Sequence, residues 1–178
     1  PPSCPGLGCD VSDNTTGTIG VGVIGAGWLG DVHARAWGRL RHHYADLGVT
    51  PQFVAVADSV PGAREAAVAK HGFATAYGDW RDLIADPGVE AVSVTAPNAL
   101  HREIGVAVAQ AGKHLWIEKP VGLSAADAQA VADAVAAAGV QGTVGFNYRA
   151  VPASARLREL VAEGVIGMPT HARVRLLT

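Results

Sequence analysis

Residues 18–30 read Thr-Ile-Gly-Val-Gly-Val-Ile-Gly-Ala-Gly-Trp-Leu-Gly, and this stretch decides which fold the chain can adopt. Its apolar, mostly β-branched first half is typical of a buried strand. Gly25, Gly27 and Gly30 follow at G-x-G-x-x-G spacing, ahead of a segment with helical periodicity. In such a unit the first glycine permits a sharp turn, the second lets a pyrophosphate approach the backbone, and the third lets the helix pack on the sheet. The loop predicts a dinucleotide site formed by Gly25, Ala26, Gly27, Trp28, Leu29 and Gly30.

The glycine motif alone is not specific, because glycines are common where strands join helices and methyltransferases carry similar loops. Its context is more informative. Strands are expected at residues 18–24, 52–58, 73–77, 89–96, 114–118 and 140–147. Helices are expected between them at residues 28–47, 61–71, 80–85, 98–111 and 125–138. Parallel strands need crossover connections, which place helices on both faces of the sheet, so we expect an α/β fold with a doubly wound parallel sheet of the Rossmann type.

Composition limits the classes of protein to which the chain can belong. Its 178 residues are 49% hydrophobic and 17% charged, with a formal net charge of -2. These values argue against a disordered tail and against a nucleic-acid binder steered by bulk charge. No apolar run approaches the roughly 20 residues of a membrane span, and the first residues lack the features of a signal peptide. We expect a soluble cytoplasmic protein without membrane or nucleic-acid partners.

Residues 1–17 are rich in turn formers and lack hydrophobic periodicity, which indicates a flexible leader. Cys4 and Cys9 lie in this leader at C-x4-C spacing, with no second pair of ligands nearby. Two reduced thiols are therefore favoured over a metal site, and no metal is expected. We divide the remaining chain into a dinucleotide-binding domain, residues 18–147, and the start of a second domain, residues 148–178.

Asp58 ends the second predicted strand, where a dinucleotide fold places the carboxylate that accepts hydrogen bonds from the adenosine ribose. A carboxylate at this position would repel a 2′-phosphate, so NAD is favoured over NADP. Ser59 and Arg64 lie nearby and keep NADP as an alternative. The competing interpretation is that Asp58 only caps the next turn.

Three later motifs follow in the order typical of one enzyme family. Residues 95–101 read Thr-Ala-Pro-Asn-Ala-Leu-His, residues 118–120 read Glu-Lys-Pro, and residues 145–149 read Gly-Phe-Asn-Tyr-Arg. From about residue 19 to its end, the chain closely resembles the glucose-fructose oxidoreductase, inositol dehydrogenase and MocA family. The resemblance implies an NAD(P)-dependent dehydrogenase that moves hydride between the cofactor and a hydroxyl-bearing carbon of a sugar, cyclitol or related polyol.

The resemblance also implies roles for individual residues of these motifs. Pro97, Asn98 and His101 would lie along the dinucleotide; the alternative is that Asn98 only caps its helix, and both roles could hold at once. Glu118 would contact the nicotinamide end of the cofactor, and the peptide bond between Lys119 and its proline would be cis.

Lys119 is the predicted catalytic residue. The resemblance places it beside the nicotinamide and the substrate hydroxyl, where an ammonium group could orient the hydroxyl and stabilise oxyanion character as hydride leaves. Without the resemblance, an ordinary exposed lysine is the commoner case. Arg149 is expected either to contact the cofactor or to form a structural ion pair. His33, His42 and His43 have no partner visible in the sequence and are interpreted as surface or packing residues.

Members of this family continue with a second α/β domain whose open sheet covers the substrate side and supports oligomer contacts, which implies a homo-oligomer. Here residues 152–163 predict the connecting helix, residues 164–169 a turn, and residues 171–177 the first strand of a truncated α+β substrate domain. The family's D-x-x-x-H-type motif, which supplies a catalytic histidine and aspartate, has no counterpart in the sequence. We therefore expect a fragment that binds cofactor without turning over substrate.

Two other functions stay open at this point. Some relatives of the family are glycosidases that use bound NAD transiently, and the chain could instead be a non-catalytic dinucleotide-binding module.

Overall fold

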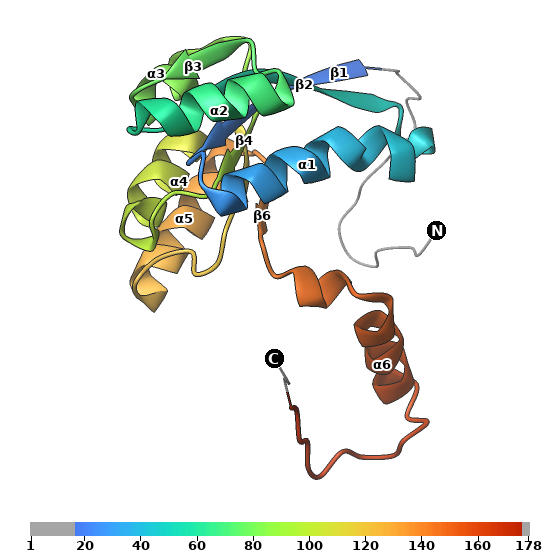
Figure 1. Cartoon of the computed structure of the whole chain (residues 1–178). Helices are drawn as coiled ribbons and strands as arrows, with labels where there is room; N and C mark the ends of the chain where they lie inside the picture. Colours follow the sequence, from blue (N-terminus) through green and yellow to red (C-terminus); the bar gives the residue numbers. More distant parts are fainter. Residues whose placement is uncertain (1–16, 176–178) are drawn as a thin grey trace. The chain divides into compact units, whose positions relative to one another are not determined.

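Residues 17–175 are described by a computed structural model (Figure 1). The predicted leader lies outside the described residues except for Gly17, which begins the first strand. Cys4 and Cys9 also lie outside them. The chain divides into two compact units, of which the first ends at Val144 and the second begins at Gly145. The sequence had suggested a division after residue 147.

Six parallel strands form a single sheet in the first unit, in the order β3-β2-β1-β4-β5-β6. Their bounds are β1 Gly17–Ile24, β2 Val49–Ala57, β3 Thr75–Tyr77, β4 Ala91–Val94, β5 His114–Ile117 and β6 Gly142–Val144. The order reverses between β1 and β4, and ligands of doubly wound sheets bind at such a switch point, outside the carboxyl ends of the strands. The predicted doubly wound sheet is confirmed.

Helices cover both faces of this sheet (Figure 1). The helices of one face are α1 (Trp28–His43) and α2 (Pro61–His71), and those of the other are α3 (Trp80–Ala85), α4 (His101–Gln110) and α5 (Ala125–Ala138). Val23 and Val56 belong to the apolar cluster under α1 and α2, whereas Ile24 and Ala57 belong to the cluster under α3, α4 and α5. Because successive side chains of a strand point to opposite faces, a continuous apolar run fills both layers.

The helix that follows the glycine loop is shorter than predicted. α1 ends at His43 rather than at residue 47, and a separate 3-10 helix, η1 (Ala45–Leu47), follows it. Tyr44 was expected to continue the apolar face of α1, but 61% of its surface is exposed. A further turn would therefore bury little apolar surface, and packing of such a surface supplies most helical stability in proteins. Gly48, at φ 67°, ends η1 instead of α1.

β2 begins at Val49 rather than at residue 52, so it contains Pro51, which falls between the predicted helix and the predicted strand. Pro51 pairs with Ile19 of β1. On its other side, β2 pairs with β3 only at residues 55–57. The outer edge of β2 is thus open at Pro51, and a residue without an N–H is tolerated at an open edge.

A short turn precedes α4, although the sequence predicted a regular helix from residue 98. This turn is the 3-10 helix η2 (Asn98–Leu100), and no side chain caps it. The capping role considered for Asn98 is therefore wrong. Asp79 and Ser124 cap α3 and α5 with their side chains.

The second unit contains the 3-10 helix η3 (Asn147–Ala150) and α6 (Pro152–Ala162), which corresponds to the predicted connecting helix. Residues 171–175 form no strand, and residues 176–178 of the predicted strand lie outside the described residues. A strand needs a partner for its backbone groups, and none is paired with residues 171–175. Within residues 17–175, no helix is long and apolar enough to cross a membrane.

Candidate functional site

The three glycines of the loop after β1 differ in what a side chain at each position would meet. Gly25 has φ 95°, and a Cβ on it would lie 2.8 Å from the Thr95 backbone. A Cβ on Gly30 would overlap the Gly25 carbonyl oxygen, which accepts a 2.7 Å hydrogen bond from Thr95 Oγ1. A Cβ on Gly27 would meet nothing within 4 Å. The fold therefore requires the first and third glycines, whereas the second leaves the backbone open to a ligand.

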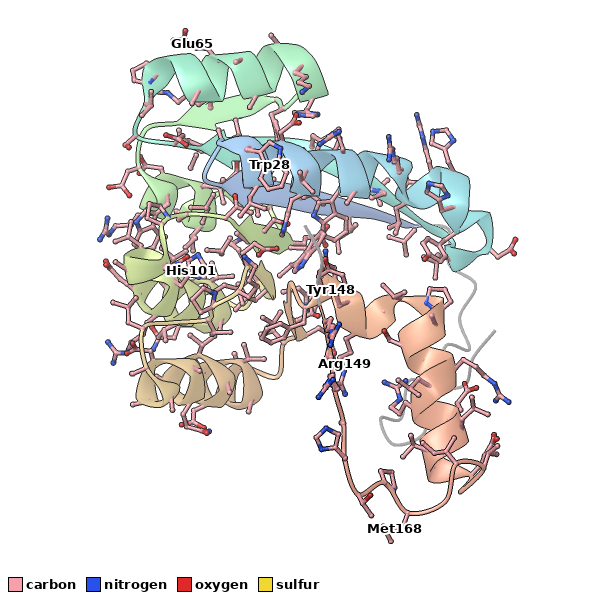
Figure 2. The ribbon with its side chains drawn as sticks, turned by 60° about the horizontal axis from the view of Figure 1, so that its bottom comes forward. Trp28, Glu65, His101, Tyr148, Arg149 and Met168 are labelled. Carbon is pink, nitrogen blue, oxygen red and sulfur yellow. The ribbon has the colours of Figure 1, made fainter. Side chains whose placement is uncertain are left out.

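The start of α1 presents backbone donors at this loop. Gly27 is the N-cap residue, and no side chain caps the helix. The first N–H groups of a helix have no partner within it, and the positive end of the macrodipole lies at the same place. Trp28, whose surface is 76% exposed, projects beside the loop (Figure 2). A strand, a glycine turn and an uncapped helix start together form the usual binding site of a nucleotide phosphate.

Asp58 connects the glycine loop to the start of α2. Its Oδ2 accepts a 2.7 Å hydrogen bond from the Ala26 N–H, and its Oδ1 accepts a 2.8 Å hydrogen bond from the Val60 N–H. Arg64 Nη1 donates to the Asp58 carbonyl oxygen at 3.0 Å. Asp58 thus caps the turn after β2, as the competing interpretation had it, and also holds the loop. A carboxylate has about four lone-pair sites, so acceptor capacity remains for ribose hydroxyls.

A cavity of about 270 Å³ opens beside Asp58, along the ends of the strands. Its walls come from the segments that follow β1, β2, β3 and β4 and include Trp80, Arg81, Pro97 and Leu100. The Arg81 guanidinium lies 4.2 Å from the centroid of the Trp80 ring. The sequence suggested Pro97 as a site residue but not Trp80 or Arg81. The feature of the sequence that could have identified these two residues is their position shortly after the predicted strand at residues 73–77.

His101 and Asn98 lie in different environments. Asn98 is exposed at the start of η2. His101 is 1% exposed at the start of α4 (Figure 2), and its two ring nitrogens lie within hydrogen-bonding distance of the carbonyl oxygens of Ala96 and Pro120. The contact of both residues with a dinucleotide stays a prediction. For His101, the structure shows that both ring nitrogens are engaged within the protein.

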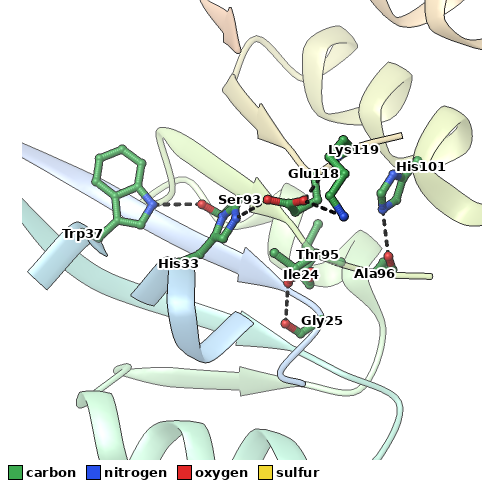
Figure 3. A network of polar contacts seen from close by, with 10 residues as sticks. All are labelled: Ile24, Gly25, His33, Trp37, Ser93, Thr95, Ala96, His101, Glu118 and Lys119. Carbon is green, nitrogen blue, oxygen red and sulfur yellow. Dashed lines mark hydrogen bonds and ion pairs between the residues drawn. The ribbon is translucent and has the colours of Figure 1, made fainter. Parts of the chain in front are cut away.

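Glu118 and Lys119 follow β5 and differ in exposure. Glu118 is 8% exposed, whereas the Lys119 side chain is 58% exposed. The Glu118 Oε2 accepts a 3.1 Å hydrogen bond from the Lys119 N–H and lies 3.9 Å from Lys119 Nζ (Figure 3). The Lys119–Pro120 bond is cis, as expected. A buried carboxylate therefore stands next to an accessible ammonium group at the edge of the sheet.

His33 of α1 is the buried partner of Glu118. Its Nε2 lies 3.2 Å from Glu118 Oε1 (Figure 3). Its ring stacks on Trp116 at 3.9 Å between centroids. Burial lowers the pKa of His33, against the smaller upward effect of the Glu118 carboxylate. The neutral ring then donates from Nε2, and Nδ1 has no partner among the described residues. The sequence had suggested a surface or packing role, because a partner 85 positions away is not visible in it.

Residues 19–146 match the family model GFO_IDH_MocA, described as an oxidoreductase family with an NAD-binding Rossmann fold. The chain belongs to this family. It is 35% identical over 149 residues to the levoglucosan dehydrogenase of Pseudarthrobacter phenanthrenivorans, an alignment that covers 84% of this chain and 38% of that protein. It is 36% identical over 160 residues to the inositol 2-dehydrogenase of Salmonella typhimurium, covering 88% of this chain and 46% of that enzyme.

Solved structures give the same family assignment. A levoglucosan dehydrogenase in complex with NADH and L-sorbose aligns with a TM-score of 0.80 and 35% identity, over 84% of this chain and 40% of that chain. An NAD-binding oxidoreductase from Klebsiella pneumoniae aligns with a TM-score of 0.79 and 40% identity, over 85% and 40%. The chain thus has the NAD-binding Rossmann fold of the GFO_IDH_MocA family and spans less than half the length of these relatives.

Arg149 lies in η3, within the second unit. Arg149 was expected either to contact the cofactor or to form a structural ion pair, and both interpretations stay predictions. The same holds for the role of Glu118 at the nicotinamide.

The lowered pKa of His33 predicts a pH-dependent stability. In the unfolded chain histidine has its ordinary pKa of about 6.5, so the unfolded state binds this proton first as the pH falls. The free energy of unfolding should therefore decrease below about pH 6.5, by at most about 1.4 kcal/mol per pH unit for this one group.

Urea unfolding of the wild type and of His33→Gln between about pH 5 and 8 measures this pH dependence of the free energy of unfolding. The variant should lose this part of the pH dependence, and His114→Gln, which changes an exposed histidine, should keep it. Equal slopes in wild type and His33→Gln would contradict the assignment.

Proposed function

We propose that this chain is the cofactor-binding part of an NAD-dependent dehydrogenase that acts on a hydroxyl-bearing carbon of a sugar, cyclitol or related polyol. The observation that carries the proposal is the glycine loop, which Thr95 and Asp58 hold in place while Gly27 leaves its backbone open. Relatives named for levoglucosan and inositol support this class of substrate. For the whole protein, a homo-oligomer and a cytoplasmic location stay predictions.

The geometry supports one path for the cofactor along the ends of the strands. The pyrophosphate would lie on the backbone of residues 25–30, where the helix start supplies N–H donors. The adenosine ribose would bind the remaining lone pairs of Asp58. Adenine would enter the cavity beside it, which Trp80, Arg81 and Leu100 line. Because the Arg81 guanidinium lies over one face of the Trp80 ring, a purine would pack against this pair and against the apolar side chain of Leu100.

Lys119 would act at the reacting end of this path. NAD would accept the hydride when bound, and the hydroxyl proton would pass to a base from outside the described residues, since the Lys119 ammonium has no lone pair to accept it. The Lys119 ammonium can donate a hydrogen bond to that oxygen and stabilise the negative charge that develops on it. Glu118 Oε2, at 3.9 Å from Lys119 Nζ, limits where the ammonium can lie. Because His33 holds the other carboxylate oxygen, the pair is oriented before substrate arrives.

Separate titrations with NAD and NADP test the cofactor assignment on the 178-residue chain. NAD should bind at least about tenfold more tightly, equivalent to about 1.4 kcal/mol, because the Asp58 carboxylate repels a 2′-phosphate. Calorimetry measures both dissociation constants. Asp58→Asn removes the charge but keeps only one of the two oxygens that accept from Ala26 and Val60, so affinity for both cofactors should fall while the preference for NAD over NADP narrows. Tighter binding of NADP by the wild type would contradict the proposed role of Asp58.

A further inference from the structure

The buried ring of His101 lies between two loops that end neighbouring strands. Its Nδ1 is 2.6 Å from the Pro120 carbonyl oxygen, and its Nε2 is 2.8 Å from the Ala96 carbonyl oxygen. Ala96 follows β4, and Pro120 follows Lys119 in the segment after β5. The ring therefore joins the segment that carries Lys119 to the end of the adjacent strand, and Figure 3 shows its contact with Ala96.

Both partners of the ring are carbonyl oxygens, which can only accept hydrogen bonds. A neutral imidazole has one N–H donor and one lone pair, so it can satisfy one of these oxygens and would direct its lone pair at the other. A buried acceptor without a donor is costly, by about 1–3 kcal/mol. Only the imidazolium provides a donor for each oxygen. We propose that His101 carries a proton on both ring nitrogens and is a positioning residue that fixes the Lys119 segment.

The surroundings of the ring are compatible with a buried positive charge. Hydrogen bonds from a charged donor are roughly twice as strong as neutral ones, and two of them here offset part of the cost of desolvation. Charged side chains on the elements around His101 have contacts with one another: Arg102 with Asp127, Glu103 with Arg81, and Glu118 with both His33 and Lys119. The two carbonyl oxygens are thus the polar partners of the ring among the described residues.

Two histidines would then hold the Lys119 segment from different sides. His33 donates to Glu118 from α1 as a neutral ring, and His101 donates to Pro120 from α4 as an imidazolium. Loss of one proton from His101 would free one of its two carbonyl partners and loosen the segment. The positioning of a catalytic lysine rests on the proposed function, whereas the protonation state of His101 does not.

Nitrogen-15 NMR of the labelled 178-residue chain tests the protonation state directly. At about pH 7.5, where a solvent-exposed histidine is mostly neutral, both His101 ring nitrogens should give signals of protonated nitrogens. His33 should show one protonated and one unprotonated nitrogen, and the exposed His114 serves as an internal comparison. A His101 ring with one unprotonated nitrogen at this pH would overturn the proposal.

The positioning role needs a readout at Lys119 itself. In His101→Gln the amide proton of Lys119 should exchange with solvent several-fold faster than in wild type, whereas His114→Gln should leave its exchange unchanged. If His101→Gln does not fold, His101→Asn is followed in the same way. Unchanged exchange in a folded His101 variant would refute the positioning role. Failure of NAD to bind would refute the proposed function and leave these results intact.

Discussion

Replacing Gly27 with alanine is expected to weaken NAD binding by at least about tenfold while changing the free energy of unfolding by no more than about 0.5 kcal/mol. The fold has room for the added methyl group, since nothing lies within 4 Å of a Cβ at this position, and the backbone φ of -72° suits any residue. The same methyl group would occupy the space through which a pyrophosphate reaches the backbone. Calorimetric titration with NAD and urea unfolding of the same variant measure the two effects.

Gly30→Ala is the matched control, because its added methyl group meets protein instead of ligand. That methyl would overlap the Gly25 carbonyl oxygen and approach Thr95 Oγ1 to 3.3 Å. Such overpacking costs about 1–3 kcal/mol or more, so both stability and NAD affinity should fall. If Gly27→Ala bound NAD as wild type does, the pyrophosphate could not lie on this loop.

The parts of the fold that could be predicted from the sequence depend on local chemistry. The glycine loop, the continuous apolar strands and the caps at Asp79 and Ser124 each involve residues a few positions apart. The errors occurred where distant packing decides the outcome. Tyr44 has apolar spacing but no surface to pack on, and Pro51 is accepted in β2 because β3 is too short to reach it.

The site shows the same division between local and distant contacts. Asp58 could be identified from its place at the end of a strand, but its bond to Ala26 spans 32 positions and required the structure. His33 was interpreted as an ordinary residue because its partner, Glu118, comes from another strand end. For a similar reason, the sequence did not suggest Trp80 and Arg81 as cavity residues. They line the cavity because the sheet brings the ends of β2, β3 and β4 together.

Replacing Lys119 with methionine is expected to lower turnover by about 10²–10³-fold, the usual cost of removing one hydrogen-bond donor to a developing oxyanion. The Lys119 side chain is 58% exposed and lies at the reacting end of the proposed path, so its loss should change NAD affinity by less than about threefold. Steady-state kinetics of the whole protein, with calorimetry for NAD, separates the two effects.

The control for this substitution is Arg156→Met, which removes a cation of similar exposure. Arg156 pairs with Glu159 at 3.0 Å and lies on α6, so its loss should leave kcat unchanged. Glu118→Gln is a second test variant, because an amide keeps the shape of the carboxylate but weakens its electrostatic attraction to the Lys119 ammonium. Its kcat should fall between those of wild type and Lys119→Met. Wild-type turnover in Lys119→Met would show that hydride transfer proceeds without an ammonium at this position, and the substrate hydroxyl would then need a donor from outside this chain.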